Sequence, residues 1–382
     1  MRSADKKRPE AHSATVGAAS QRRVLVANQQ LWRYSGSEIH ALQLAEYFKE
    51  QGDEVIFFAV STRPWLAAEI TARGIEIADW RSLRHELRKG FDIVWTHHEP
   101  PFYLLHILCG VRCRLAIHGI LSRVVRLERV PLLPLSAQPD KFVILANSVE
   151  TRDEITARSG QDGISVLLNI VPDAFQAHHK RNYAPELRRV AVVSNHIPDE
   201  VIAARNVLKE RGVEVDLFGK GHKELLVDQS TLVDFDVVVT IGKTAQYALV
   251  QGIPLFLYDV FGGPGYVGPD GFKRHEDFNF SGRSAPQRMS AEDLAQALMD
   301  GYAGAAESAC ELRELYGDRY AIGSQTEWVM ARTAAEALPL YGFRARLWSI
   351  VVTGLLRPTV PLRLICPEYV DTVGKWLKKK QN

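Results

Sequence analysis

Residues 236–266 read DVVVTIGKTAQYALVQGIPLFLYDVFGGPGY, and this stretch decides the fold. The apolar run 237–239 predicts a buried strand, and the Gly-Lys-Thr triplet at 242–244 opens a helix. A second buried strand follows at 254–258 and runs into the glycine-rich loop 261–265. Strand, helix and strand in this order are typical of a parallel sheet, and glycine-lined turns at strand ends suit a phosphorylated ligand.

Strands and helices alternate along the rest of the chain in two blocks. Further strands are predicted at 23–27, 54–60, 92–96, 114–119, 141–146, 165–168, 190–194 and 214–218. Helices are predicted around 39–48, 67–73, 200–210, 291–302, 305–315 and 325–337. This order predicts an α/β protein with two doubly wound domains, whose ligands bind at the carboxyl ends of the strands.

The length of 382 residues suits two domains, and composition shifts place their limits. We expect a disordered tail at 1–21, an N-terminal domain at 22–171, a polar linker at 172–188, a C-terminal domain at 189–338 and a basic tail at 339–382. The first segment lacks the apolar region of a secretory signal. No apolar stretch is long enough to predict a membrane-spanning helix.

Composition and charge exclude several classes of protein. The net charge of +2 gives no basic field for nucleic acid, so we expect no nucleic-acid partner. The four cysteines are Cys109, Cys113, Cys310 and Cys366, and none has the spacing of a zinc site. We therefore expect reduced thiols in a cytoplasmic protein and no metal.

The tail from Leu340 onward carries eight arginines and lysines, interleaved with Trp348, Trp376 and aliphatic residues. A basic, aromatic and amphipathic segment is typical of peripheral binding to an anionic membrane surface. The alternative is a terminal helix that packs back across both domains and ends in a frayed basic segment. The two interpretations are compatible.

Residues 23–60 read RVLVANQQLWRYSGSEIHALQLAEYFKEQGDEVIFFAV, a strand, a glycine turn, a Glu- and His-bearing helix and a second strand. Four later segments follow in order, at 92–98, 116–119, 146–152 and 168–171. Together these five segments resemble the motifs of the retaining family 4 glycosyltransferases of the GT-B fold. The resemblance covers the N-terminal half. It implies two Rossmann-like domains facing a central cleft, hexosyl transfer (EC 2.4), and a nucleotide-sugar substrate without a metal or other cofactor.

The C-terminal half departs from that family. Its members carry an arginine and a lysine after the first strand of this domain, but here residues 194–199 read SNHIPD. Aligning on Gly252-x-Pro254 puts Tyr247 where the family has the glutamate that binds the donor ribose. What replaces that glutamate stays open, as does the choice between retention and inversion.

Nine residues are candidates for holding the donor. They are Gly36, Ser37, Asn195, His196, Lys220, Lys243, Thr244, Gly262 and Gly263. Most lie at predicted strand ends or helix starts, where backbone amides and a cation can neutralise a diphosphate. The alternatives are ordinary turns, a plain helix N-cap and a sharp loop.

His118 is the candidate catalytic residue, because it ends a strand of the first domain where the resemblance implies a group facing the reacting sugar. It can hydrogen-bond the sugar or the diphosphate, or act as an acid or base, although a lone histidine is more often structural. His97, His98 and Glu99 end the neighbouring strand and are candidates for contact with the acceptor, unless this is a solvated loop.

Arg123, Arg126 and Arg129 follow at every third position, and we assign the first two to the acceptor site. On a helix they would form one basic stripe. Such a stripe can grip the phosphates of a lipid-linked acceptor or lie on an anionic membrane. It can equally be a solvated face.

These features predict a glycosyltransferase that moves a sugar from a nucleotide-sugar donor to a glycan or lipid-linked acceptor. We expect it to act in bacterial cell-surface polysaccharide synthesis, in the cytoplasm or peripherally on the inner membrane face. Two alternatives remain: a nucleotide-sugar 2-epimerase, and a non-catalytic GT-B scaffold or partner subunit, which the tyrosine at 247 favours.

Overall fold

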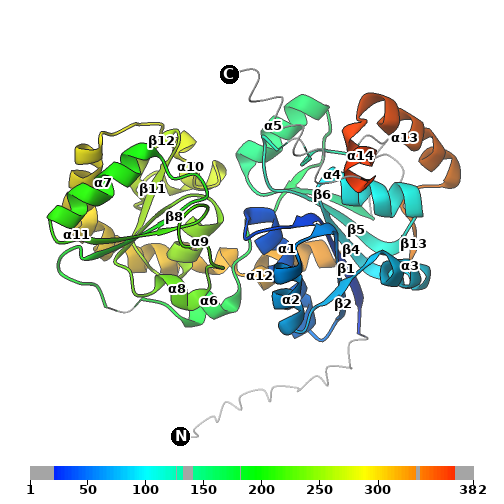
Figure 1. Ribbon diagram of the computed structural model, residues 1–382, viewed down its shortest axis with the longest axis horizontal. Coiled ribbons are helices and arrows are strands. Elements are labelled where there is room, and N and C mark those ends of the chain that lie inside the picture. The colour runs from blue at the N-terminus through cyan, green and yellow to red at the C-terminus, as the bar shows by residue number, and fades with distance from the viewer. Residues whose placement is uncertain (1–20, 126, 132–140, 181, 333–335, 366–382) are drawn as a thin grey trace, which may run out of the picture.

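The computed structural model describes residues 21–125, 127–131, 141–180, 182–332 and 336–365. The predicted disordered tail, except its last residue, lies outside these ranges, as do Arg126 and the last part of the basic tail. The described chain forms two α/β domains that lie side by side (Figure 1).

The N-terminal domain is built on a parallel sheet in the order β3-β2-β1-β4-β5-β6-β7. Its strands are β1 (Arg23–Leu31), β2 (Glu54–Thr62), β3 (Glu76–Ala78), β4 (Phe91–His97), β5 (Arg112–Ile120), β6 (Phe142–Ala146) and β7 (Ser165–Val166). A short strand, β13 (Leu338–Pro339), pairs antiparallel with β5. Its helices are α1 (Gly36–Glu50), α2 (Pro64–Ala72), α3 (Trp80–Lys89), α4 (Glu99–Phe102) continuing into the π-helix Tyr103–Cys109, and α5 (Val149–Ser159).

The sheet of this domain is buried on both faces, as β1 illustrates. Val24 and Val26 belong to one apolar cluster, while Leu25 and Ala27 belong to another on the opposite face. Successive side chains of a strand point to opposite faces, so an uninterrupted apolar run is required where helices cover both. The strands predicted from apolar runs in the first block are confirmed, because burial on both faces is what makes such runs necessary.

The C-terminal domain has a five-stranded sheet in the order β12-β11-β10-β8-β9. Its strands are β8 (Arg189–Val193), β9 (Glu214–Phe218), β10 (Val237–Thr240), β11 (Leu255–Asp259) and β12 (Gly262–Tyr266). Its helices are α6 (Asp173–Ala177), α7 (Asp199–Glu210), α8 (Gln229–Leu232), α9 (Lys243–Val250), α10 (Phe272–Asp277) and α11 (Ala291–Tyr316), with 3-10 turns at Gly282–Ser284 and Gly317–Tyr320. The strand, helix and strand predicted from residues 236–258 are present as β10, α9 and β11.

Two elements of this domain differ from the sequence prediction. The predicted loop 261–265 is mostly strand β12, which pairs antiparallel with β11. A Cβ atom at Gly263 would lie 2.0 Å from the Leu257 carbonyl oxygen, so the hairpin closes only around glycine. The two helices predicted at 291–302 and 305–315 form one helix, α11. Within it, Gly301 packs against the ring of Tyr266, which a Cβ atom would approach to 2.6 Å.

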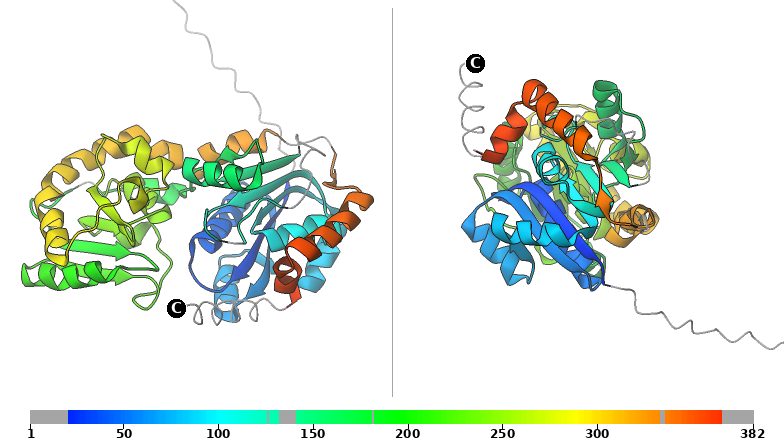
Figure 2. Two further views of the ribbon diagram at one scale, coloured as in Figure 1. Left: turned by 90° about the horizontal axis from the view of Figure 1, so that it is seen from above. Right: turned by 90° about the vertical axis from the view of Figure 1, so that its right-hand side faces the viewer.

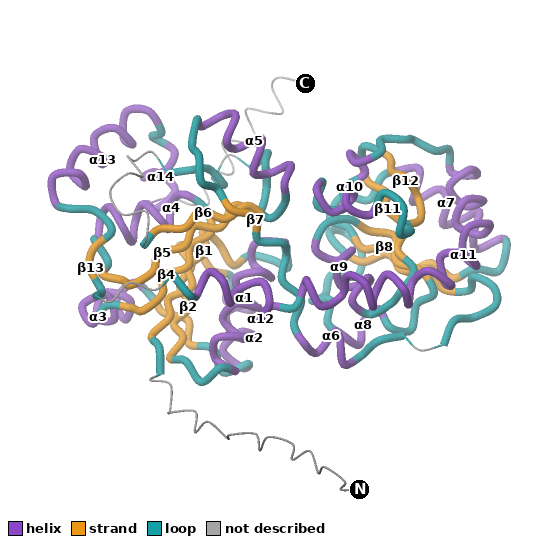
Figure 3. The backbone as a smooth tube through the Cα atoms, turned by 180° about the vertical axis from the view of Figure 1, so that it is seen from behind, coloured by secondary structure: helices purple, strands orange, loops and turns teal. Residues whose placement is uncertain are grey.

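The chain passes between the domains twice, at adjacent points. The Val171 amide donates to Tyr320, and Ile322 donates back to Val171. Helix α12 (Ile322–Met330) then packs into the core of the N-terminal domain and lies near α1 (Figure 3). The predicted end of the second domain at 338 is therefore too late. The predicted linker also differs, because Phe175 of α6 is buried in the C-terminal domain.

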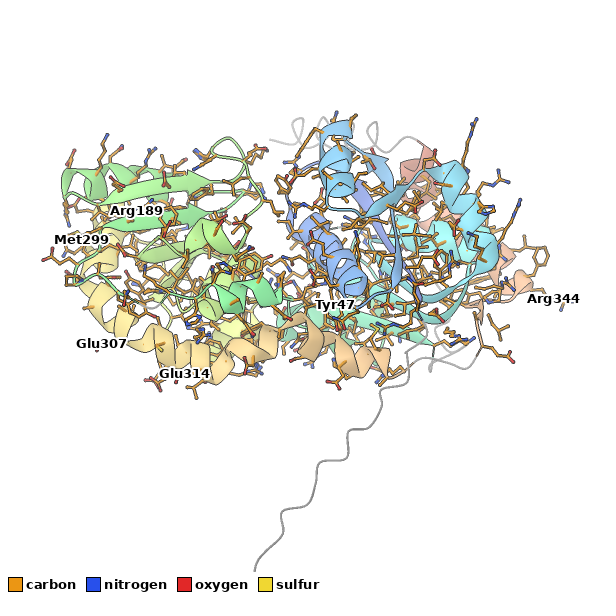
Figure 4. All side chains as sticks on the ribbon, turned by 90° about the horizontal axis from the view of Figure 1, so that it is seen from below. Tyr47, Arg189, Met299, Glu307, Glu314 and Arg344 are labelled. Carbon is orange, nitrogen blue, oxygen red and sulfur yellow. The ribbon has the colours of Figure 1, made fainter. Side chains whose placement is uncertain are left out.

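Helices α13 (Phe343–Leu356) and α14 (Thr359–Ile365) lie on the N-terminal domain, away from the domain junction (Figure 2). Leu340, Tyr341 and Val360 anchor this segment in an apolar cluster of that domain. Figure 4 shows Arg344, on α13, at the outer end of the molecule. The described tail thus packs back on one domain only. None of the helices in the described ranges combines the length and hydrophobicity that a membrane crossing requires.

Candidate active site between the two domains

Each sheet has a point at which the strand order reverses. In the N-terminal domain this point lies between β1 and β4, and in the C-terminal domain between β8 and β10. Ligands of open α/β sheets bind outside the carboxyl ends of the strands at such points. The segments that follow these strands are therefore the first place to look for a site.

The contacts between the domains join these two points. Gln43 of α1 donates to the Tyr247 hydroxyl of α9 at 2.7 Å, and the Lys243 ammonium at the start of α9 donates to the Ile170 carbonyl at 2.8 Å. Asn169 donates to the side chain of Asn279 at 2.8 Å. The carboxyl end of the first domain thus faces the N-terminus of α9.

A group of buried polar atoms without hydrogen-bond partners in the described structure lies on the N-terminal side of this junction. They are Asn28 Oδ1, Gln29 Oε1, Glu38 Oε2, both ring nitrogens of His40, Gln43 Oε1 and His97 Nε2. All belong to the carboxyl ends of β1 and β4 or to α1. Buried polar groups are nearly always hydrogen-bonded, so a cluster of exceptions indicates a place where a polar ligand completes the set.

His97 and His40 lie in this group beside Lys243. Their rings meet edge to face with centroids 5.1 Å apart. Burial lowers the pKa of His97 to about 3 and that of His40 well below its usual value, and the charge of Lys243 lowers both further. Both rings are therefore neutral near pH 7. The Gly119 carbonyl lies 3.4 Å from His97 Nδ1, which leaves Nε2 to accept a hydrogen bond.

Two buried carboxyl groups, missed in the sequence, lie in the same region. Burial raises the pKa of Glu38 to about 7 and that of Glu128 to about 8, and Glu38 raises the pKa of Glu128 further. The Leu121 amide donates to Glu128, whose Oε1 lies 3.6 Å from His98 Nε2. His98 itself has a φ of +70°, which a residue with a side chain rarely adopts. Carboxyl groups with a pKa near neutrality are suited to proton transfer.

His118, the predicted catalytic residue, is fully enclosed. Its Nδ1 lies 3.1 Å from the Thr96 hydroxyl, and its Nε2 lies 2.9 Å from the Arg129 carbonyl. Burial lowers its pKa to about 4. Both ring nitrogens thus have protein partners, and a direct role in catalysis stays a prediction.

The other residues predicted to bind the acceptor do not form one site in the structure. Glu99 is buried beneath Arg357, which donates to it. Arg123 lies near Glu150, with Nε 3.4 Å from a carboxylate oxygen. Arg126 lies outside the described residues.

The predicted donor residues fall into four places. Lys243 and Thr244 begin α9, while Gly36 and Ser37 begin α1, with Gly36 exposed. Asn195, His196 and Lys220 lie together at the ends of β8 and β9, where the Lys220 amide donates to Asn195 Oδ1 at 3.2 Å. Gly262 and Gly263 pack against backbone carbonyls of Gln287 and Leu257, so this packing requires glycine whether or not a ligand approaches.

Tyr247 stands at the position where the resemblance implies a ribose-binding carboxylate. Its ring is 1% exposed and stacks on Phe175 with centroids 4.2 Å apart. Its hydroxyl holds α1 through Gln43. This residue therefore joins the domains, and it presents no carboxylate to a ligand.

A cavity of about 210 Å³ opens between the domains beside α9. Arg123 lines it from the first domain, while Gly242, Phe261 and Arg283 line it from the second. Arg283 donates to Glu150 at 2.8 Å and lies 5.4 Å from the centre of the Phe261 ring. Arg123 pairs with the same carboxylate, so two guanidinium groups outnumber one acidic group here. With a helix N-terminus and an aromatic ring beside them, they suit an anionic ligand.

The raised pKa of Glu128 predicts a pH effect on stability. The folded protein keeps a proton that the unfolded chain loses near pH 4.5, so folding is stabilised at low pH and loses stability as pH rises toward 8. Glu128→Gln keeps the hydrogen-bond acceptor and removes this titration. From pH 6 to pH 8, the natural protein should therefore lose about 2 kcal/mol of unfolding free energy relative to the variant, as measured by urea unfolding. The exposed Glu210→Gln is the control, and equal pH profiles would contradict the prediction.

Comparison with known proteins shows likeness in structure but not in sequence. No protein-family profile matches the sequence, and no curated protein sequence matches it. A glycosyltransferase from Rickettsia africae ESF-5 superposes with a TM-score of 0.52 at 12% identity, over 82% of this chain and 98% of that one. Anabaena Alr3699/HepE in complex with UDP superposes with a TM-score of 0.54 at 9% identity, over 81% and 98%. The same protein with UDP and glucose gives 0.51 at 10% identity, over 81% and 99%.

These likenesses show that the chain has the GT-B fold of glycosyltransferases. The predicted fold class, two Rossmann-like doubly wound domains, is thereby confirmed. The structural neighbours are glycosyltransferases. At sequence identities of 9 to 12%, the structural similarity establishes the fold alone.

Proposed function

We propose that the protein transfers a sugar from a nucleotide-activated donor to an acceptor hydroxyl. The observation that supports this most is the cluster of unpartnered buried polar atoms that faces Lys243 across the domain junction. That cluster lies where the N-terminal sheet reverses its strand order and faces the start of α9, which follows β10. Such a place suits a polar ligand that touches both domains.

In the proposed reaction, the bond between the sugar C1 and the phosphate oxygen breaks, and the nucleoside diphosphate leaves with the electron pair. Lys243 and the amides that begin α9 would neutralise the charge that develops on the leaving oxygen. C1 bonds to the acceptor oxygen, whose proton passes to a phosphate oxygen or to the carboxylate of Glu38. We expect this to need no metal ion.

The finer assignments rest on the sequence. We propose hexosyl transfer with retention, as the resemblance to family 4 implies, to a glycan or lipid-linked acceptor in cell-surface polysaccharide synthesis. We place the reaction in the cytoplasm, peripherally on the inner membrane face. The Anabaena neighbour was crystallised with UDP, which makes UDP-sugars the first donors to test.

The test is a panel of nucleotide sugars incubated with the purified full chain, with and without the chelator EDTA. We expect slow release of the nucleoside diphosphate from one donor, unchanged by EDTA, and a rise in Tm with the matching diphosphate. Nuclear magnetic resonance of the products separates hydrolysis or transfer from 2-epimerisation. If no nucleotide of the panel is cleaved or raises Tm, the protein is a non-catalytic relative and the proposal is wrong.

A further inference from the structure

A second cavity, of about 220 Å³, lies on the N-terminal domain. Four arginines line it, namely Arg123, Arg129, Arg158 and Arg357. They come from three separate parts of the chain: the segment after β5, helix α5, and the end of α13. Arg123 also lines the cavity between the domains, so the two cavities are neighbours.

Three carboxylates pair with arginines of this cavity: Glu150 with Arg123, Glu154 with Arg158, and Glu99 with Arg357. The four arginines outnumber these carboxylates by one, which leaves the cavity cationic. Arg158 pairs with Glu154 at 2.5 Å and donates to the Arg123 carbonyl at 2.8 Å, yet its side chain is 57% exposed. Glu128 is the acidic residue among the described lining residues. Burial raises its pKa to about 8, so it carries a proton near pH 7. Clustered guanidinium groups in a concave site are suited to bind phosphate.

Helix α13 ends at this cavity and exposes its apolar residues. Its buried residues are Ser349 and Thr353, whereas its large apolar side chains face outward. They are Phe343, Leu347, Trp348, Ile350, Val351, Leu355 and Leu356. A surface helix normally buries its apolar face, so this reversed pattern marks an interaction surface.

Helix α13 is fixed to the domain by hydrogen bonds, and its exposed apolar residues adjoin an arginine of the cavity. Arg346 donates to the carbonyls of Ile107 and Leu108 at 2.7 Å each, which fixes α13 on the end of the π-helix. Leu355 and Leu356, 75% and 69% exposed, immediately precede Arg357 in the cavity wall. Figure 3 shows α13 and α14 on the same side of the domain as α5.

We propose that the arginine-lined cavity and the apolar face of α13 together bind a phosphate-bearing lipid, with its phosphate among the arginines and its hydrocarbon along α13. A protein partner would need acidic groups and an apolar surface in the same order, and a lipid phosphate supplies both in one molecule. If the proposed function holds, the position of Arg123 between the two cavities makes this lipid the acceptor.

Binding can be tested on the full chain without any nucleotide. Calorimetric titration with dodecyl phosphate, below its micelle concentration, would be compared with inorganic phosphate and with dodecyl maltoside. We expect dodecyl phosphate to bind at least about tenfold more tightly than either, a difference of 1.4 kcal/mol. Equal binding of inorganic phosphate would show an anion site without a lipid role. Equal binding of the maltoside would show that the arginines contribute nothing; either result overturns the proposal.

Variants at exposed positions locate the site without disturbing the core. Arg158→Ala and the double variant Leu355→Ser with Leu356→Ser should each weaken dodecyl phosphate binding about tenfold. The controls are Arg152→Ala, on the same helix but outside the cavity, and the exposed Leu315→Ser on α11, which should not change it. Unchanged binding in both test variants, or a stable dimer whose formation the leucine variant abolishes, would overturn the proposal. Donor cleavage is measured separately, so failure of the proposed function would not be mistaken for failure of this site.

Discussion

Replacing Lys243 with methionine should lower kcat/KM for the cleaved nucleotide sugar by about 100-fold or more, the usual cost of losing one stabilising group at a developing oxyanion. Burial lowers the pKa of this lysine well below its usual value, and its ammonium contacts the Ile170 carbonyl at the start of α9. The measurement is steady-state release of the nucleoside diphosphate by the natural protein and by the variant.

Lys209→Met is the matched control, because Lys209 is an exposed lysine of the same domain in the last turn of α7. It should leave turnover unchanged. Methionine at 243 also removes a buried amine that is costly to desolvate, so the variant should fold at least as well as the natural protein. If it folds and turns over normally, Lys243 serves only to tie the two domains through Ile170.

The parts of the fold that the sequence predicts are those set by local patterns. The strands β10 and β11 are mostly continuous apolar runs, which the sequence alone reveals. The antiparallel strand β12 has no such pattern. Its sequence, GGPGY, becomes a strand only because glycine lets it pack against β11.

The candidate site was predicted only where its residues follow strand ends or helix starts. His97 and Lys243 were found in this way, because the carboxyl ends of strands are expected to face the ligand. Glu38, His40 and Glu128 were missed. They occupy helix or loop positions that sequence alone cannot distinguish from packed ones, and they converge only when β1, β4 and the segment after β5 are adjacent in space.

Tyr247→Glu, which supplies the carboxylate that the resemblance implies, should damage the protein instead of restoring a ribose contact. It removes a fully buried aromatic ring that stacks on Phe175, and it places a charge in an apolar cluster. Loss of a buried aromatic side chain costs about 4 kcal/mol, which lowers Tm by roughly 8 °C or more. The measurement is thermal unfolding followed by circular dichroism, together with the affinity for the nucleoside diphosphate.

Tyr247→Phe separates the ring from the hydroxyl. It keeps the stack on Phe175 and removes only the acceptor for Gln43, which should cost about 1 to 3 kcal/mol because a buried amide loses its partner. Since that hydrogen bond joins α1 to α9, its loss should also loosen the domain junction and raise KM for the donor with a small change in kcat. A glutamate variant that is as stable as the phenylalanine variant and binds the diphosphate more tightly would show that position 247 faces the ribose after all. The structure predicts that the glutamate variant is the less stable of the two and binds the diphosphate no more tightly, because the ring of Tyr247 is buried and stacked on Phe175.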